Sequence, residues 1–415
     1  MTEISQPFAA RDFRFYWFAR LCSTLAQNCL VVVIGWQVYN IARASMGIKR
    51  AALQLGFVGL AQFAPLFALV LVTGWVADHM DRRRIAQFCI ALQLASAAIL
   101  CVATFTGRIS LTTIFAVAVL LGIARAFSMP ALGALAPNLV PRPLVPRAIA
   151  ANSIATRVGA IIGPAVGGYL YAATPALPYA ASAGLLALSL ACMASLRPVA
   201  QPPTSRSGNP WRQMIEGLAY VRANRLVLGA ISLDLFAVLL GGATAMLPIY
   251  AQDILHVGPA GLGHLRAAPA AGAMLSALWF TYRPLSRRVG IKMLFSVGIF
   301  GAATTIFGLS RWMPLSLVCL FLLGAADMLS VYVRQSLIQI GTPDAMRGRV
   351  GAVSSLFVSA SNELGEAESG FLAALIGPVA AVVAGGSGAI LVAILWSQWF
   401  PMLRRAGDFE EGSTT

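Results

Sequence analysis

Long apolar segments dominate this sequence and limit what it can fold into. Twelve of them reach the roughly 20 mostly apolar residues that a helix needs to cross a lipid bilayer. The predicted helices cover residues 14–41, 53–77, 84–106, 110–130, 148–173, 177–196, 226–251, 260–282, 290–309, 313–340, 349–376 and 378–402. Because a bilayer offers no hydrogen-bond partner to exposed backbone, we expect an all-α polytopic membrane protein with 12 transmembrane helices.

The composition excludes several other classes of protein. Only 11% of the 415 residues are charged and 58% are hydrophobic. A soluble globular protein carries about 25% charged residues, so a soluble fold of this chain would expose large apolar patches to water. The composition therefore argues against a soluble enzyme, a disordered chain and a disulfide scaffold. All 6 cysteines lie in apolar segments without CxxC spacing, which indicates neither a metal site nor a disulfide framework.

The basic residues predict an orientation in the membrane. The net charge of +15 comes from short basic clusters between apolar segments, not from the basic face of a soluble domain, so nucleic acid is not an expected partner. With both termini in the cytoplasm, 20 of the 30 basic residues lie in inner loops, 5 in outer loops and 5 within helices. Basic residues concentrate in cytoplasmic loops, and this bias predicts an N-in, C-in topology.

One polar stretch divides the chain into two repeated halves. Residues 197–225 are rich in Pro, Ser, Gly and Asn, and predict a cytoplasmic linker with an amphipathic surface helix near Trp211–Arg222. We expect a six-helix bundle over 1–196, and a second bundle with a short cytoplasmic tail over 226–415. At offsets of 204 and 202 the halves match at Gly59/Gly263, Pro65/Pro269, Gly122/Gly324, Gly163/Gly365 and Gly168/Gly370. Two parallel repeats are typical of a rocking transporter with its site between them.

The loop after the second predicted helix carries a recognisable motif. It reads Gly74-Trp-Val-Ala-Asp78-His79-Met80-Asp81-Arg82-Arg83-Arg84. It resembles the signature Gly-x-x-x-Asp-Arg-x-Gly-Arg-Arg/Lys of the major facilitator superfamily at Gly74, Asp78, Arg82 and Arg83, and departs from it at His79 and Asp81. A glycine lets two helices approach closely, and an aspartate is stabilised at a helix N-terminus. The resemblance implies a latch that holds the outward-facing state. The alternative is a topology-setting arginine cluster with an ordinary helix cap.

The fifth predicted helix carries a second motif of the same superfamily. Its residues Gly159, Gly163, Pro164, Gly167 and Gly168 match the pattern Gly-x-x-x-Gly-Pro-x-x-Gly-Gly of antiporters and exporters. Glycines at i, i+4 and i+8 make one flat face for close packing, and the proline allows a bend. The motif favours export over import. Three further stretches, Gly122–Pro130, Leu265–Pro269 and Pro343–Arg349, are similar to the branch that contains enterobactin-type siderophore exporters, and the resemblance covers nearly the whole chain. Members of that branch handle drugs, siderophores and lipids.

Polar and charged residues inside apolar segments are the main functional signal. A charged group at the bilayer centre costs about 2.5–3.5 kcal/mol, so such side chains must pair, face water or change protonation. The proton-coupling candidates are Asp234, Asp327, Glu363 and Glu366. The charge-pair or substrate candidates are Arg20, Arg125, Arg266, Arg334, Gln27 and Asn28.

Several of these residues have two interpretations. Glu363 and Glu366 share a helical face, where their mutual repulsion would let one hold a proton near neutral pH; alternatively arginines neutralise both. Asp327 is the repeat counterpart of Arg125, and pairs either with it across the halves or with Arg334 on its own helix.

The remaining candidates also stay open at this point. Asp234 is a proton site or the partner of a nearby arginine. Arg20 is expected to extend toward the membrane surface rather than bind a ligand. Arg266 lies deeper and suits an anionic substrate group or a carboxylate partner. Gln27 and Asn28 either face a cavity or bond between helices.

Together these features predict a transporter of the bacterial inner membrane. We expect export of a small amphipathic or hydrophobic compound, siderophore- or drug-like, by proton antiport and rocker-switch alternating access. The expected partners are the bilayer, the small-molecule substrate and protons; we expect a monomer with no enzymatic activity, no cofactor and no metal. The alternatives are a proton-independent lipid or metabolite carrier, and a non-transporting scaffold or receptor on the same fold.

Overall fold

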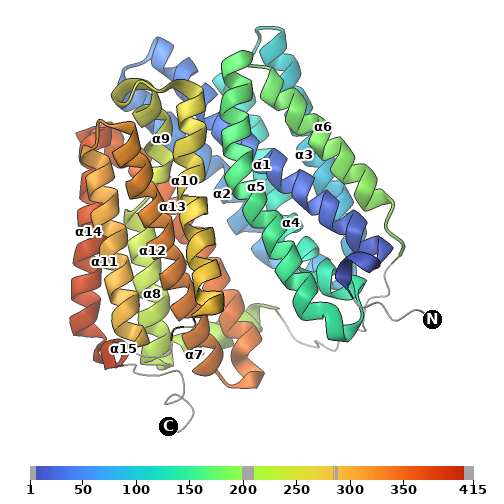
Figure 1. The fold of residues 1–415 in the computed structure, drawn as a ribbon, viewed down its shortest axis with the longest axis vertical. Coiled ribbons are helices and arrows are strands. Elements are labelled where there is room, and N and C mark those ends of the chain that lie inside the picture. The colour runs from blue at the N-terminus through green and yellow to red at the C-terminus, as the bar shows by residue number, and fades with distance from the viewer. Residues whose placement is uncertain (1–5, 199–209, 284, 286–287, 406–415) are drawn as a thin grey trace. The chain divides into compact units, whose positions relative to one another are not determined.

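The protein is helical throughout the part that the computed structural model describes, which comprises residues 6–198, 210–283, 285 and 288–405 (Figure 1). The long helices are α1 (Arg11–Ser45), α2 (Ile48–His79), α3 (Arg82–Phe105), α4 (Leu111–Leu135), α5 (Val145–Ala173), α6 (Leu177–Ala194), α7 (Pro210–Ala223), α8 (Arg225–Leu240), α10 (Gly258–Tyr282), α11 (Val289–Leu309), α12 (Met313–Ile340), α13 (Asp344–Ile376) and α14 (Pro378–Trp399). Short elements are η1 (Pro7–Ala9), η2 (Ala136–Leu139), η3 (Arg142–Leu144), η4 (Ala243–Met246), α9 (Leu247–Ile249), η5 (Tyr250–Ile254) and α15 (Pro401–Arg405).

Ten helices of the described chain are long and apolar enough to cross a membrane. They are α1, α2 as far as Leu69, α3, α4, α5 with η3, α6, the run from α8 to η5, α11, α12 and α14. The other two predicted spans also form long helices, α10 with 25 residues and α13 with 33. Glutamates in the middle of α13 lower its hydropathy. A count of 12 spanning helices and the N-in, C-in orientation stay predictions.

Side-chain caps explain where several helices begin. The Asp81 carboxylate accepts a hydrogen bond from the Arg83 backbone N–H at 2.9 Å and starts α3. Ser110 accepts from the Thr113 N–H at 3.2 Å and starts α4. The first motif therefore contains a helix cap, and the capping residue is Asp81, one of the two departures from the signature.

The helix predicted for residues 226–251 is interrupted in the structure. α8 ends at Leu240, and the chain continues through 3₁₀ and π-helical turns to Ile254. A side chain at Gly241 would collide with the Phe300 ring of α11, and one at Gly242 with the Gly365 carbonyl of α13. The two glycines therefore allow α8 to end in close contact with both neighbours.

The chain forms two compact units. Unit 1 comprises Met1–Ile41, Ala61–Ser207 and Gly258–Ala267, and unit 2 comprises Ala42–Leu60, Gly208–Val257 and Ala268–Thr415. Each unit includes a short piece of the other half: the start of α10 belongs to unit 1, and the start of α2 belongs to unit 2. The bundle boundaries predicted at 197–225 stay a prediction.

Each unit has its own apolar core. In unit 2, α11 packs against α12 and α14, in the orange and red part of Figure 1. Their buried residues, with those of α8, form one cluster, and Trp396 of α14 donates a hydrogen bond from Nε1 to Ser232 Oγ at 3.0 Å. In unit 1, the fully buried Tyr16 donates from its hydroxyl to the Leu132 carbonyl at 2.8 Å.

Candidate functional site

A buried ion pair joins α8 and α12 in unit 2. Nη1 of Arg334 lies 3.0 Å from Oδ2 of Asp234, and the two side chains are 3% and 4% exposed. Ser330, one turn before Arg334, donates from Oγ to Oδ1 of Asp234 at 3.4 Å. The prediction that Asp234 is the partner of a nearby arginine fits this geometry. Arg334 pairs with Asp234, although its own helix also carries Asp327.

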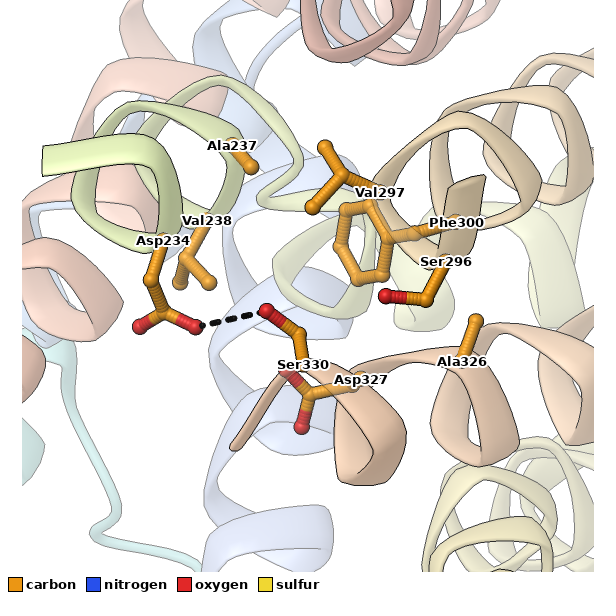
Figure 2. A pocket seen from close by; sticks show the side chains of 9 residues that line it. All are labelled: Asp234, Ala237, Val238, Ser296, Val297, Phe300, Ala326, Asp327 and Ser330. Atoms are coloured by element: carbon orange, nitrogen blue, oxygen red, sulfur yellow. Dashed lines mark hydrogen bonds between the residues drawn. The ribbon is translucent and has the colours of Figure 1, made fainter. Parts of the chain in front are cut away.

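The ion pair borders a small, mainly apolar pocket inside unit 2. The pocket lies between α8, α11 and α12 and is lined by Asp234, Ala237, Val238, Ser296, Val297, Phe300, Ala326, Asp327 and Ser330. Figure 2 shows Ser330 between the carboxyls of Asp234 and Asp327. Ser296 donates its hydroxyl proton to the Met293 carbonyl at 2.8 Å, which leaves its oxygen as an acceptor. Two carboxyls and two hydroxyls in one small space suit the exchange of a proton.

Glu366 lies where α13 crosses the start of α2. Gly56 and Gly370 face each other there, so that a side chain at Gly370 would approach the Gly56 Cα to 2.6 Å. At Gly59, one turn further along α2, an added Cβ would lie 3.6 Å from Oε2 of Glu366. The Glu366 carboxyl is therefore held against the backbone of α2 at a glycine crossing.

The other two glutamates of α13 have different surroundings. Glu363 is 7% exposed, and its carbonyl oxygen faces Gly59. Glu368 is half-buried and accepts a hydrogen bond from Ser369 Oγ at 3.5 Å. Both Glu363 and Glu366 have polar partners in the structure.

The glycine motif of α5 contacts two other helices, α1 and α10. An added side chain at Gly159 would meet Thr24 at 2.6 Å, one at Gly163 would meet Asn28 at 2.8 Å, and one at Gly167 would meet Cys29 at 3.0 Å. These contacts run along α1, as the i, i+4, i+8 spacing predicts. Gly168 faces α10 instead, where a side chain at Gly263 would approach the Pro164 carbonyl to 2.6 Å.

The two glycine crossings occupy corresponding places in the sequence repeat. Gly168 and Gly370 match at the offset of 202, and Gly59 and Gly263 match at 204. The α5–α10 crossing in unit 1 is thus the counterpart of the α2–α13 crossing in unit 2. At the 202 offset, the residue that corresponds to Glu366 is Pro164.

The polar residues of α1 are mostly bonded between or within helices. Gln27 donates from Nε2 to Gln93 Oε1 of α3 at 2.9 Å, and Asn28 donates from Nδ2 to the Thr24 carbonyl at 2.8 Å. Of the two interpretations, a cavity-facing side chain or a bond between helices, the hydrogen bond of Gln27 fits the second. The Nε atom of Arg20 is buried and has no hydrogen-bond partner among the described residues.

Other predicted residues lie apart from the pocket. Arg125 of α4 is exposed, Arg266 of α10 is half-buried, and both have polar partners. The surroundings of Gly74 and the side chain of Asp78 lie outside the part that the structure describes. Arg83 donates from Nη2 to the Ala194 carbonyl at 3.3 Å, so this arginine of the first motif binds the C-terminal end of α6 within unit 1. The latch role stays a prediction.

The sequence does not indicate the role of some residues at these sites. Ser330 and Gln93 are polar residues of a kind that is common in apolar helices. Arg43 lies in a predicted outer loop, yet its Nε is 3.6 Å from Oδ1 of Asp253 in η5. The sequence does not predict this ion pair, because it does not show that the end of α1 lies close to η5.

Comparisons with known proteins agree with this architecture. Residues 2–409 match the MFS_3 family, described as transmembrane secretion effector. The enterobactin exporter EntS of Escherichia coli O1:K1 is 28% identical over 399 residues, 95% of this chain and 92% of the relative. EntS of Shigella boydii serotype 18 shows the same identity and coverage.

Solved structures show the same fold. A D-xylose–proton symporter superposes with a TM-score of 0.72 at 14% identity, over 94% of this chain and 98% of that chain. A bacterial homologue of the human lysosomal transporter Spinster superposes with a TM-score of 0.70 at 14% identity, over 99% of both chains. The relatives are transporters, not enzymes, and the protein is a multi-pass protein of the bacterial inner membrane. The chain belongs to the transmembrane secretion effector family of the major facilitator superfamily.

Proposed function

We propose that this transporter exports a small amphipathic compound of the siderophore or drug type in exchange for protons. The match to the enterobactin exporter EntS over 95% of the chain supports a siderophore-type substrate. The glycine-proline motif of α5, which packs against both α1 and α10, supports export.

The position of Glu366 carries the coupling part of the proposal. Its carboxyl lies against the α2 backbone at Gly59, in a crossing where a side chain at Gly370 would approach the Gly56 Cα to 2.6 Å. Rocking of the two halves requires helices at such crossings to part. Glu366 has polar partners in the structure, and gain or loss of a proton at its carboxyl would change the charge that meets those partners. We therefore infer that proton exchange at Glu366 accompanies the closing and opening of the crossing.

The pocket between α8, α11 and α12 contributes a second proton-exchanging group. Asp234 keeps its charge balanced by Arg334, and Ser330 connects it to the side of the pocket where Asp327 lies. In this scheme Asp234 and Arg334 position the pocket, and Asp327 exchanges the proton.

Transport in proteoliposomes tests the proposal. With enterobactin as the probe, a pH gradient should drive accumulation, and nigericin should abolish it. Glu366→Gln should lose the gradient-driven component and keep downhill exchange, because the amide cannot release a proton. Glu368→Gln is the matched control on the same helix, and it should behave like the wild type.

The possible outcomes separate the alternatives. Enterobactin flux that ignores the pH gradient in the wild type, with normal flux in Glu363→Gln and Glu366→Gln, would show a proton-independent carrier. If a pH gradient drives flux of other amphipathic compounds but not of enterobactin, the proposed proton coupling stands and the proposed substrate is wrong. Absence of flux of any compound would favour a scaffold.

A further inference from the structure

The amphipathic helix α7 lies at the membrane surface because of its place in the chain. It ends at Ala223, and a single residue, Asn224, separates it from α8. Oδ1 of Asn224 accepts from the backbone N–H groups of Leu226 at 3.1 Å and Val227 at 3.2 Å, which starts α8 at once. Because the run from α8 to η5 is long and apolar enough to span the bilayer, the C-terminal end of α7 is held at the bilayer surface.

One face of α7 is fixed to unit 2. A side chain at Gly217 would lie 2.9 Å from the Arg349 carbonyl, so α7 lies directly on the start of α13. Oε2 of Glu216 pairs with Nη1 of Arg349 at 3.1 Å, and the Tyr220 hydroxyl donates to the Gly341 carbonyl at 2.8 Å. Val221 is 1% exposed within an apolar cluster of unit 2. These contacts hold α7 in one orientation.

A different face of α7 carries an uncovered apolar stripe. Trp211, Ile215 and Leu218 are 58%, 61% and 46% exposed. Their spacing of four and three residues places them in one line along the helix, and Arg222, four residues after Leu218, extends that line. The stripe is therefore fixed at the membrane surface, turned away from the protein.

The charges beside the stripe are positive. Glu216, the acidic residue of α7, is neutralised by Arg349 and by Arg212, whose Nε lies 3.0 Å from Oε1. Arg222 and Arg225 are exposed at the junction of α7 and α8. A tryptophan-containing apolar stripe with basic residues at its end has the chemistry of a helix that lies in the interface of an anionic bilayer.

We propose that α7 is an interfacial anchor that binds anionic phospholipid. Trp211, Ile215 and Leu218 enter the boundary between headgroups and acyl chains, and Arg222 and Arg225 bind the phosphate-bearing headgroups. The leaflet is the one that borders the start of α8, which is the cytoplasmic leaflet in the predicted orientation. Through Glu216 and Arg349, lipid binding at α7 also stabilises the start of α13. This inference does not depend on the transported substrate or on proton coupling.

Hydrogen exchange of the full-length protein in nanodiscs tests the proposal. Discs contain either phosphatidylcholine alone or phosphatidylcholine with phosphatidylglycerol, and the readout is exchange of the α7 amides. We expect slower exchange with phosphatidylglycerol, by up to about thirtyfold if both arginines act fully at the anionic surface. Arg222→Gln with Arg225→Gln should remove this lipid dependence. Ile215→Gln with Leu218→Gln should speed exchange in both kinds of disc.

A matched pair of arginines serves as the control. Arg108 and Arg311 are exposed in loops that lie on the other side of the membrane in the predicted topology. Their replacement by glutamine should leave the lipid dependence of α7 unchanged. Equal exchange of α7 in the two kinds of disc would overturn the proposal. Protection that disappears when each disc holds a single protein copy would also overturn it, because a second copy would then cover the stripe.

Discussion

The buried pair Asp234–Arg334 should show strong energetic coupling. At 3.0 Å, two unit charges attract by about 5–6 kcal/mol at an effective dielectric constant of about 20. Both side chains are almost fully buried, so removal of one partner leaves the other charge in an apolar core. We therefore expect Asp234→Asn and Arg334→Met each to lower the free energy of unfolding by about 3–5 kcal/mol.

A double-mutant cycle measures this coupling. The variant with both replacements leaves no unpaired charge from this pair, so it should regain most of the stability that either single variant loses. Unfolding of the purified protein in mixed micelles by denaturant, followed by tryptophan fluorescence, gives the four free energies. The exposed pair Arg212–Glu216 is the control, and Arg212→Gln should change stability by at most about 1 kcal/mol. Additive losses in the Asp234/Arg334 double variant would refute the reasoning.

Two further predictions concern helix packing and capping. Gly263→Ala places a methyl group about 2.6 Å from the Pro164 carbonyl, so it should reduce transport strongly, whereas Gly298→Ala, in open space on α11, should leave transport unchanged. Normal transport by Gly263→Ala would mean that the α5–α10 crossing is not needed. Asp81→Ala removes the hydrogen bond to the Arg83 N–H and should destabilise the protein by about 1 kcal/mol in the same unfolding assay. Unchanged stability would show that another group caps α3.

The sequence predicts helices better than it predicts their partners. Each of the twelve apolar segments overlaps a helix, because a long apolar segment satisfies its backbone hydrogen bonds most readily as a helix. The glycine spacing of α5 likewise predicts one packing face, and the contacts to Thr24, Asn28 and Cys29 follow it. Residue spacing within one helix therefore predicts which face of that helix packs against a neighbour.

Such patterns do not predict contacts between helices that are distant in the sequence. Asp234 and Arg334 are 100 positions apart, and nothing in either segment favours this pair over a pair of Asp327 and Arg334 on one helix. The break in the seventh predicted helix also depends on its neighbours: Gly241 and Gly242 are needed because Phe300 and Gly365 approach there. The glycine pair in the sequence indicates that a helix can break at this point. The sequence does not show the neighbouring residues that make the break necessary.

The sequence repeat connects the packing of the two units to the proposed coupling. Both glycine crossings have the same construction, since a side chain on one helix would meet the backbone of the other. One of the positions at which they differ has Pro164 in the first half and Glu366 in the second half. Proline at that position shapes a helix and has no titratable group, whereas glutamate adds a proton-binding group to the same contact. Under the proposed antiport, a shared crossing opens and closes in both halves, and the carboxyl in only one of them links that movement to protons.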